Sequence, residues 1–375
     1  MRTRSRTLRA LRDQKLFTAR IAKKCRKGRE ENRPLSVVLM LLFLFVATFS
    51  GAQTCPRNVI VTVLDAHGLP ISNLAASNFK TFYRGKPLIP LSASFHSDPA
   101  TRTFLLLDTA ASMGGLGAQG IAKWKIARMA ASEFLLAAPP QAEVSLFTFS
   151  ATVGKTFHSG DGRKSMQDWI DSPESIRASS LAGKAALHRT LLDMVKTLEP
   201  TRPGDAIYLV SDGRNDLKLS MASSVAEELQ SNGVRLFSFS LNDAGESDLY
   251  SVDEGEHSET MPPPSPGPKE LADLVRASGG LELTLHPGSG RVGQSFGKTN
   301  YDYDEKSRQE ARIAASAFET AISNFYVLAV NLPEDARGLG EWQVEIVDGQ
   351  GKTRKDVTLS YPGRIPGCVA SPVNL

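Results

Sequence analysis

Short apolar runs alternate with segments of helical periodicity through the middle of the chain. Runs of this length are typical of strands that are buried on both faces of a sheet. The expected strands are 104–107, 144–149, 206–210 and 234–241. The expected helices, in which apolar residues recur every three or four positions, are 123–137, 187–198, 225–230 and 270–277. This alternation predicts an α/β fold, a doubly wound, mostly parallel sheet with helices on both faces.

The segments before and after this α/β region carry the patterns of β strands instead. Strand-like segments are 57–63, 79–83, 87–94, 325–331, 342–347 and 354–361, and 304–324 has a helical pattern. We expect the strands of 57–99 and 325–364 to pair. The α/β domain would then be inserted into a flanking, sandwich-like β module built from both chain ends.

The expected organisation has five parts. They are a signal peptide (1–52), the first part of the β module (53–100), the α/β domain (101–287), a loop with a connecting helix (288–324), and the second part of the β module with a tail (325–375). Within the α/β domain, residues 244–268 are first acidic and then rich in proline. This composition indicates an exposed, partly polyproline insertion before the last helix of the domain.

Charge is distributed unevenly along the chain. The formal net charge is +4, yet residues 1–34 hold thirteen Lys and Arg residues against three acidic ones, and 35–52 carry no charge. The rest of the chain is therefore net acidic, and the sequence gives little support for nucleic-acid binding.

The N-terminal pattern indicates export. The basic segment is followed by an apolar run at 35–49 and by the small residues Ser50, Gly51 and Ala52. Together these are typical of a secretory signal peptide cut after Ala52. The apolar run is shorter than the ~20 residues that a membrane-spanning helix requires, although retention as an anchor stays open. We expect a periplasmic or extracellular protein with no other membrane contact.

Two motifs carry the candidate chemistry. Residues 104–113 are FLLLDTAASM, and 207–213 are IYLVSDG. In this order on successive buried strands, the pair resembles the von Willebrand factor A (vWA) domain. With the β segments on either side, the arrangement resembles the vWA-related domain proteins of Acidobacteria, and the resemblance covers 57–364.

The resemblance implies a metal-ion-dependent adhesion site, with the pattern Asp-x-Ser-x-Ser, a later Thr and a later Asp. Mg²⁺ prefers about six oxygen ligands in an octahedron, several of them waters. Asp108, Ser112 and Asp212 match the pattern, whereas Ala110 replaces the middle serine and Ala185 the expected threonine. The site is therefore degenerate.

Two states of this site stay open. In one, Mg²⁺ or Mn²⁺ binds weakly and waters replace the missing hydroxyls. In the other, which we favour, no metal binds, and loop amides or the ammonium of Lys184 hold the two carboxylates. Thr109 is a poor substitute ligand because neighbouring side chains of an extended segment point in opposite directions.

The function that the resemblance implies is binding of a protein or an envelope polymer. The expected surface comprises 108–117, 183–184 and 212–215, with Thr109, Met113, Lys184, Arg214 and Asn215 as its binding residues. The alternative is a structural subunit of a cell-envelope assembly that binds without metal.

An enzyme is disfavoured. The string G-x-S-x-G at 293–297 would be a hydrolase motif only between a strand and a helix, and it lies in an expected loop. We find no pair of groups that resembles a nucleophile with its base, and we expect no catalytic residues.

Cys55 and Cys368 lie near the two ends of the exported chain. They would form a disulfide if the two parts of the β module pair, since export exposes them to an oxidising compartment. The alternative is that both cysteines are free thiols in flexible tails.

Overall fold

The computed structural model describes residues 54–115, 121–172, 175–176, 181–215, 221–241, 267–284 and 301–368, except for the side chains of Thr54 and of 301–304. The expected signal peptide, most of the proline-rich insertion and the G-x-S-x-G string lie outside the described residues. Among the helices described, none has the length and apolarity needed to cross a membrane.

A six-stranded sheet forms the centre of the α/β part, in the order β10-β9-β8-β5-β6-β7. All neighbouring strands are parallel except β6 and β7, which pair antiparallel. The strands are β5 (Arg102–Asp108), β6 (Glu143–Phe149), β7 (Val153–Phe157), β8 (Ala206–Ser211), β9 (Arg235–Ser240) and β10 (Glu282–Thr284). The predicted α/β class is confirmed.

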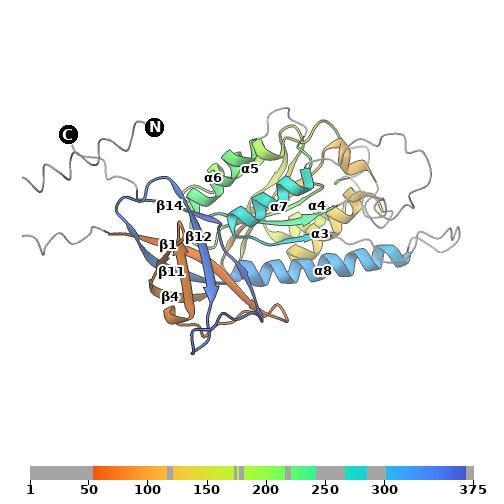
Figure 1. Cartoon of the computed structure of the whole chain (residues 1–375). Coiled ribbons are helices and arrows are strands. Elements are labelled where there is room, and N and C mark those ends of the chain that lie inside the picture. The colour runs from red at the N-terminus through yellow and green to blue at the C-terminus, as the bar shows by residue number, and fades with distance from the viewer. Residues whose placement is uncertain are drawn as a thin grey trace, which may run out of the picture. The chain divides into compact units, whose positions relative to one another are not determined.

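Helices cover both faces of this sheet (Figure 1). One face carries α3 (Lys123–Ala137), α4 (Arg163–Asp171) and α8 (Tyr301–Ser323), and the other carries α5 (Leu187–Thr197), α6 (Ala222–Asn232) and α7 (Gly267–Ser278). Side chains of β5 alternate between the two cores, with Leu105 and Leu107 facing the first and Phe104 and Leu106 the second. This alternation explains why the whole strand is apolar.

Helix α8 is part of the α/β core and does more than connect two regions. It packs along α3, and its Phe318 ring lies 5.1 Å from the ring of Tyr208 on β8. Glu133 of α3 is buried and accepts hydrogen bonds from Arg308 and Arg312 of α8. The segment that the sequence suggested as a connection therefore covers one face of the sheet.

Strands from both chain ends form two four-stranded antiparallel sheets, as expected. One has the order β13-β1-β11-β4 and the other β14-β12-β2-β3. Their bounds are β1 (Thr54–Asp65), β2 (Phe79–Tyr83), β3 (Lys86–Leu88), β4 (Pro90–Ser97), β11 (Asn324–Pro333), β12 (Leu339–Ile346), β13 (Val357–Ser360) and β14 (Arg364–Pro366). Val61, Leu328 and Trp342 are among the residues of the shared core, so the two chain ends form one module.

Short elements complete the described chain. Three 3₁₀ helices are η1 (Ala76–Asn78), η2 (Ala111–Gly114) and η3 (Ser159–Asp161). The sequence analysis did not predict α4, β7, β10 or β14. Helix α4 has only nine residues and buries Met166 and Ile170 alone, which is too weak a periodic signal to detect.

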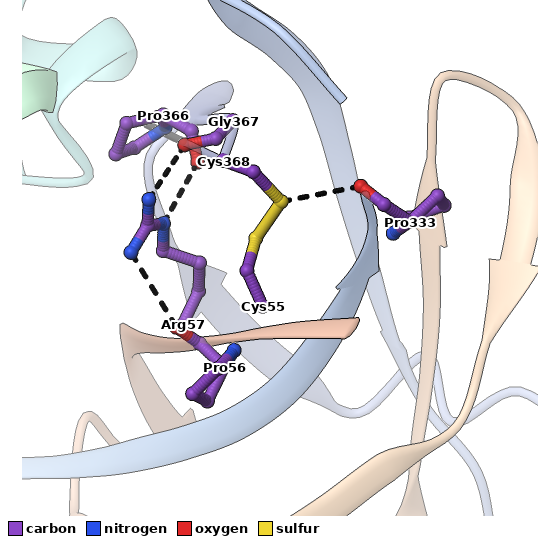
Figure 2. Close-up of a disulfide and its surroundings, with 7 residues drawn as sticks. All are labelled: Cys55, Pro56, Arg57, Pro333, Pro366, Gly367 and Cys368. Atoms are coloured by element: carbon purple, nitrogen blue, oxygen red, sulfur yellow. Dashed lines mark hydrogen bonds between the residues drawn. A yellow bond between two sulfur atoms is a disulfide. The ribbon is translucent and has the colours of Figure 1, made fainter. Parts of the chain in front are cut away.

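A disulfide joins Cys55 at the start of β1 to Cys368 after β14 (Figure 2). The Arg57 side chain strengthens the same junction by donating hydrogen bonds to the carbonyl oxygens of Pro366 and Gly367, at 3.3 and 2.6 Å. The predicted pairing is confirmed, and it follows from the antiparallel pairing of β1 with β11 and of β12 with β14.

Candidate functional site

Two buried carboxylates lie at the carboxyl edge of the parallel sheet. Asp108 is the last residue of β5, and Asp212 follows the last residue of the neighbouring strand β8. Their residues are 0% and 4% exposed. Such an edge is where open α/β sheets bind ligands.

Local hydrogen bonds hold both oxygens of Asp108. Oδ1 accepts the N–H of Ala110 at 2.8 Å, and Oδ2 accepts the hydroxyl of Ser211 at 2.7 Å. Burial, and then repulsion by Asp212, raise the pKa of Asp108 to about 7, although these hydrogen bonds and the charge of Lys123 act in the opposite direction. The carboxyl therefore joins the end of β5 to the end of β8.

A buried lysine neutralises the second carboxylate. The Nζ of Lys123, in the first turn of α3, lies 2.6 Å from Oδ2 of Asp212, and both side chains are almost fully buried. Oδ1 of Asp212 accepts the N–H of Arg214 at 3.2 Å, and the Arg214 Nε lies 3.7 Å from Oδ2. The carboxylate thus has one buried and one partly exposed cationic neighbour.

The sequence analysis proposed a different lysine for this role. Lys184 is exposed, and the ammonium beside Asp212 belongs to Lys123. In the loop of Lys184 the main chain faces the site, because the carbonyl of Gly183 accepts the N–H of Ala111 at 3.2 Å. The expectation for Lys184 is therefore corrected.

The loops at this edge are joined by main-chain hydrogen bonds. Besides the bond from Ala111 to Gly183, the N–H of Ala182 donates to the carbonyl of Thr109 at 3.3 Å. Behind them, the N–H of Ala186 donates to the carbonyl of Ser150 at 2.8 Å. The loops after β5 and before α5 therefore hold each other in place without a ligand.

The residues present do not fit a divalent metal ion. Ala110 and Ala185 are completely buried and offer no oxygen at the two positions that need hydroxyls. Asp108 uses both oxygens within the fold, and the Lys123 ammonium already lies at hydrogen-bond distance from Asp212. The described residues contain no cluster of three or more His, Cys, Asp or Glu side chains arranged for a metal.

Ser112 is the one hydroxyl that the motif keeps. Its Oγ is buried and has no hydrogen-bond partner among the described residues. A single unpaired hydroxyl does not compensate for the two missing ones, and an ammonium next to Asp212 would repel a second cation. The residue set therefore departs from the metal-binding pattern at two hydroxyls and at the ammonium beside Asp212.

The expected binding residues are not equally available at the surface. Lys184 is exposed, and the Arg214 side chain is 38% exposed. Met113, in contrast, is completely buried in the core beneath the sheet edge, so its predicted role at the surface is wrong. The hydroxyl of Thr109 donates to the carbonyl of Phe149 at 2.8 Å and thereby fixes the loop to β6.

Asn215 contacts His188, a buried histidine on α5. The Nδ1 of His188 on α5 accepts the N–H of Met221 at 3.1 Å and lies 3.1 Å from Nδ2 of Asn215. Its Nε2 lies 3.6 Å from Glu270 of α7, and burial lowers the pKa of the ring. His188 thus connects α5 and α7 to the loop after β8.

The strand order, the helices on both faces and the two acidic residues at the sheet edge define a vWA-type α/β domain. Residues 104–262 match the family model of the von Willebrand factor type A domain. The resemblance to the vWA domain that the two motifs predicted is confirmed over this range.

Several solved structures match the chain at low identity. An aerotolerance-related membrane protein from Bacteroides fragilis is 16% identical, with 59% of this chain and 98% of that chain covered and a TM-score of 0.40. BatB from Bacteroides thetaiotaomicron is 16% identical, with 57% and 98% covered and a TM-score of 0.35. A von Willebrand factor type A protein from Catenulispora acidiphila is 11% identical, with 84% and 75% covered and a TM-score of 0.37. None of the curated proteins compared matches the chain.

Proposed function

We propose that this chain is a protein-binding module that contacts its partner through the loops at the carboxyl edge of the sheet and needs no metal ion. The observation that carries the proposal is the buried ion pair between Lys123 and Asp212, at 2.6 Å. It supplies from within the chain the positive charge that a bound cation would otherwise bring to this edge. The domain family supports a binding role, and the pair explains how the edge is held without a ligand.

The exposed chemistry of these loops favours an acidic group on the partner. Lys184 and Arg214 lie on neighbouring loops, and both have exposed side-chain surface. The Arg214 side chain contacts Asp212 through its Nε at 3.7 Å and is also 38% exposed, so a partner can reach it from solvent. An arginine and a lysine can bind a carboxylate directly, the former through two parallel hydrogen bonds.

We place this interaction outside the cytoplasm. The disulfide between Cys55 and Cys368 supports that location, because such bonds persist mainly in oxidising compartments. The expected signal peptide has the same implication. Binding would then take place in the periplasm or outside the cell.

The test is affinity capture with matched charge-reversal variants. The full chain is immobilised and exposed to an envelope extract of its host, and bound proteins are quantified by mass spectrometry. Lys184→Glu and Arg214→Glu are expected to reduce the captured partner at least about tenfold, whereas chelation of divalent metals should leave capture unchanged. Lys164→Glu is the control, since Lys164 is 88% exposed and lies on α4, away from these loops.

Two outcomes would contradict the proposal. Capture that disappears when metals are chelated would show that the site still uses a cation. Capture that survives both charge reversals would place the binding surface elsewhere on the chain.

One observation favours the alternative of a structural subunit. Ile89 is 87% exposed and Leu91 is 58% exposed, and both lie at or beside β4, the edge strand of one sheet of the β module. An exposed apolar edge strand is a common place for a neighbouring chain to pair. If Ile89→Lys abolishes capture and the loop variants do not, the alternative replaces our proposal.

A further inference from the structure

A cavity lies at the end of the α/β domain opposite the candidate site, where the domain meets the β module. Its volume is about 430 Å³. One wall comes from the end of α6, the start of β9 and the loop before β8, and the other from β1, β11 and β14. Asp108 and Asp212 follow the carboxyl ends of their strands, so this cavity is separate from the candidate site above.

The charged residues of this cavity are all positive. Arg57, Arg202 and Arg235 line it, and no Asp or Glu does. Its polar lining otherwise consists of neutral side chains, and much of the remaining wall is aliphatic or proline. Arg202 has an ion pair with Glu143 at 3.2 Å, but its side chain is 59% exposed, so that pair is weak.

Neutral carbonyls, and not carboxylates, hold the other two arginines. Arg57 donates to the carbonyls of Pro366 and Gly367, as Figure 2 shows. Arg235 is 2% exposed and donates to the carbonyls of Ala321 and Ile322 at the end of α8, at 2.8 and 2.9 Å. These carbonyls orient the guanidinium groups but do not cancel their charge.

Arg235 is the most deeply buried of the three, and its guanidinium lies 5.4 and 4.9 Å from the ring centroids of Phe237 and Phe325. Its Nε is buried and has no hydrogen-bond partner among the described residues. Burial lowers its pKa to about 9, with only the more distant charge of Asp205 acting in the opposite direction. A buried cation without a carboxylate in contact is costly, and an anion in the adjoining cavity would relieve that cost.

We propose that this cavity binds a small organic carboxylate with an apolar body. The arginines would attract and orient the carboxylate, and the aliphatic wall formed by Val59, Ile60, Leu229, Val327 and Ile365 would bury the rest of the ligand. The volume lies within the usual range of small-molecule sites, roughly 300–1,000 Å³. Because the walls come from both modules, the ligand would also bridge them. This proposal does not depend on the function proposed for the loops.

The neighbouring cavity provides a contrast within the same junction. It is larger, about 590 Å³, but Glu227, Asp273 and Glu341 line it together with Arg276 and Arg364. Its positive charge is therefore compensated, and it should not select an anion. Arg276→Gln is accordingly a suitable control for the arginine variants.

The test is titration calorimetry of the full chain with decanoate, and with decanol as the uncharged probe. Decanoate is expected to bind one molecule per chain, at least about tenfold more tightly than decanol. Arg57→Gln should weaken decanoate binding about tenfold, and Arg276→Gln should leave it unchanged. Equal affinity for the two probes, or no heat with decanoate, would overturn the proposal.

A variant that blocks the cavity tests where the ligand binds and leaves all three arginines in place. Ser231 is exposed and lines the cavity, so Ser231→Trp should abolish decanoate binding. Ser224 is exposed on the same helix and does not line the cavity, so Ser224→Trp should bind normally. Full decanoate affinity in Ser231→Trp would place the ligand elsewhere and refute the assignment. Near-ultraviolet circular dichroism would verify that both variants are folded.

Discussion

Replacing Lys123 with methionine is the most direct test of the charge arrangement at the sheet edge. Methionine keeps most of the buried volume and removes the ammonium that lies 2.6 Å from Asp212. Breaking a buried ion pair by removing one partner costs about 3–5 kcal/mol, because the other charge is left buried. Arg214 still contacts Asp212 through its N–H at 3.2 Å and its Nε at 3.7 Å, so we expect a loss near 3 kcal/mol.

The assay is chemical and thermal unfolding of the wild type and a small set of variants. A loss of about 3 kcal/mol should lower the unfolding midpoint by roughly 6–12 °C in a unit of this size. Lys125→Met is the control on the same helix, because Lys125 is exposed and its loss should cost less than about 0.5 kcal/mol. A Lys123→Met protein within 1 kcal/mol of the wild type would refute the role that we assign to the pair.

Coupling between the two charges separates lost packing from lost electrostatics. Asp212→Asn alone should also destabilise the fold, but the double variant with Lys123→Met should cost clearly less than the sum of the two single variants. Additive losses would mean that Lys123 stabilises through its aliphatic chain alone.

Removing the Lys123 ammonium also makes room for a designed metal site. A variant with Lys123→Ala, Ala110→Ser and Ala185→Thr loses the ammonium and regains the two missing hydroxyls. We expect Mn²⁺ to raise the unfolding midpoint of this variant, by about 2.7 kcal/mol of stabilisation at a hundredfold excess over Kd, and to leave the wild type unchanged. Calorimetry of the wild type with Mg²⁺ and Mn²⁺ tests whether these metals leave the wild type unaffected.

Three further predictions concern other buried groups. The pKa of Asp108 is about 7 in the folded chain and 3.8 in the unfolded chain. Between these pH values the folded state binds more protons than the unfolded state, so the free energy of unfolding falls as pH rises from about 4 to 7. Asp108→Asn should flatten that fall, which amounts to about 4 kcal/mol at most, and an unchanged pH profile of urea unfolding would contradict it. Reducing the disulfide should lower the free energy of unfolding by about 2–4 kcal/mol, and non-reducing peptide mapping should recover Cys55 linked to Cys368. Glu133→Gln, which removes the buried carboxylate that Arg308 and Arg312 contact, should cost about 1–3 kcal/mol; a neutral effect in thermal unfolding would show that apolar contacts alone hold α8.

The sheet and its acidic edge could be predicted because their signals are local. A strand buried on both faces is a continuous apolar run, and in this chain two such runs end at Asp108 and at Ser211 before Asp212. The packing of α8 along α3 could not be read in the same way. The buried face of α8 is rich in alanine, as at Ala311 and Ala315, and such a face does not specify which partner it packs against.

The role of Lys123 was missed although the sequence contains a signal for it. Lys123 precedes Ile126 by three residues, Ala127 by four and Ala130 by seven, so it lies on the apolar stripe of α3. A charged residue on a buried stripe requires a partner of opposite charge, and Asp212 is that partner. Lys184, the lysine expected from the sequence, lies in a loop whose main chain contacts the site through the carbonyl of Gly183.

The two carboxylates have a use at this edge without a metal ion. Asp108 joins β5 to β8 by accepting the hydroxyl of Ser211, and Asp212 joins the loop after β8 to α3 through Lys123. A hydroxyl at Ala110 or Ala185, in contrast, would add a buried polar group that needs a partner and would offer no comparable link. The chain therefore keeps the polar side chains that Lys123 and Ser211 can pair with and lacks those that only a metal would need. The search for a partner should accordingly begin at Lys184 and Arg214.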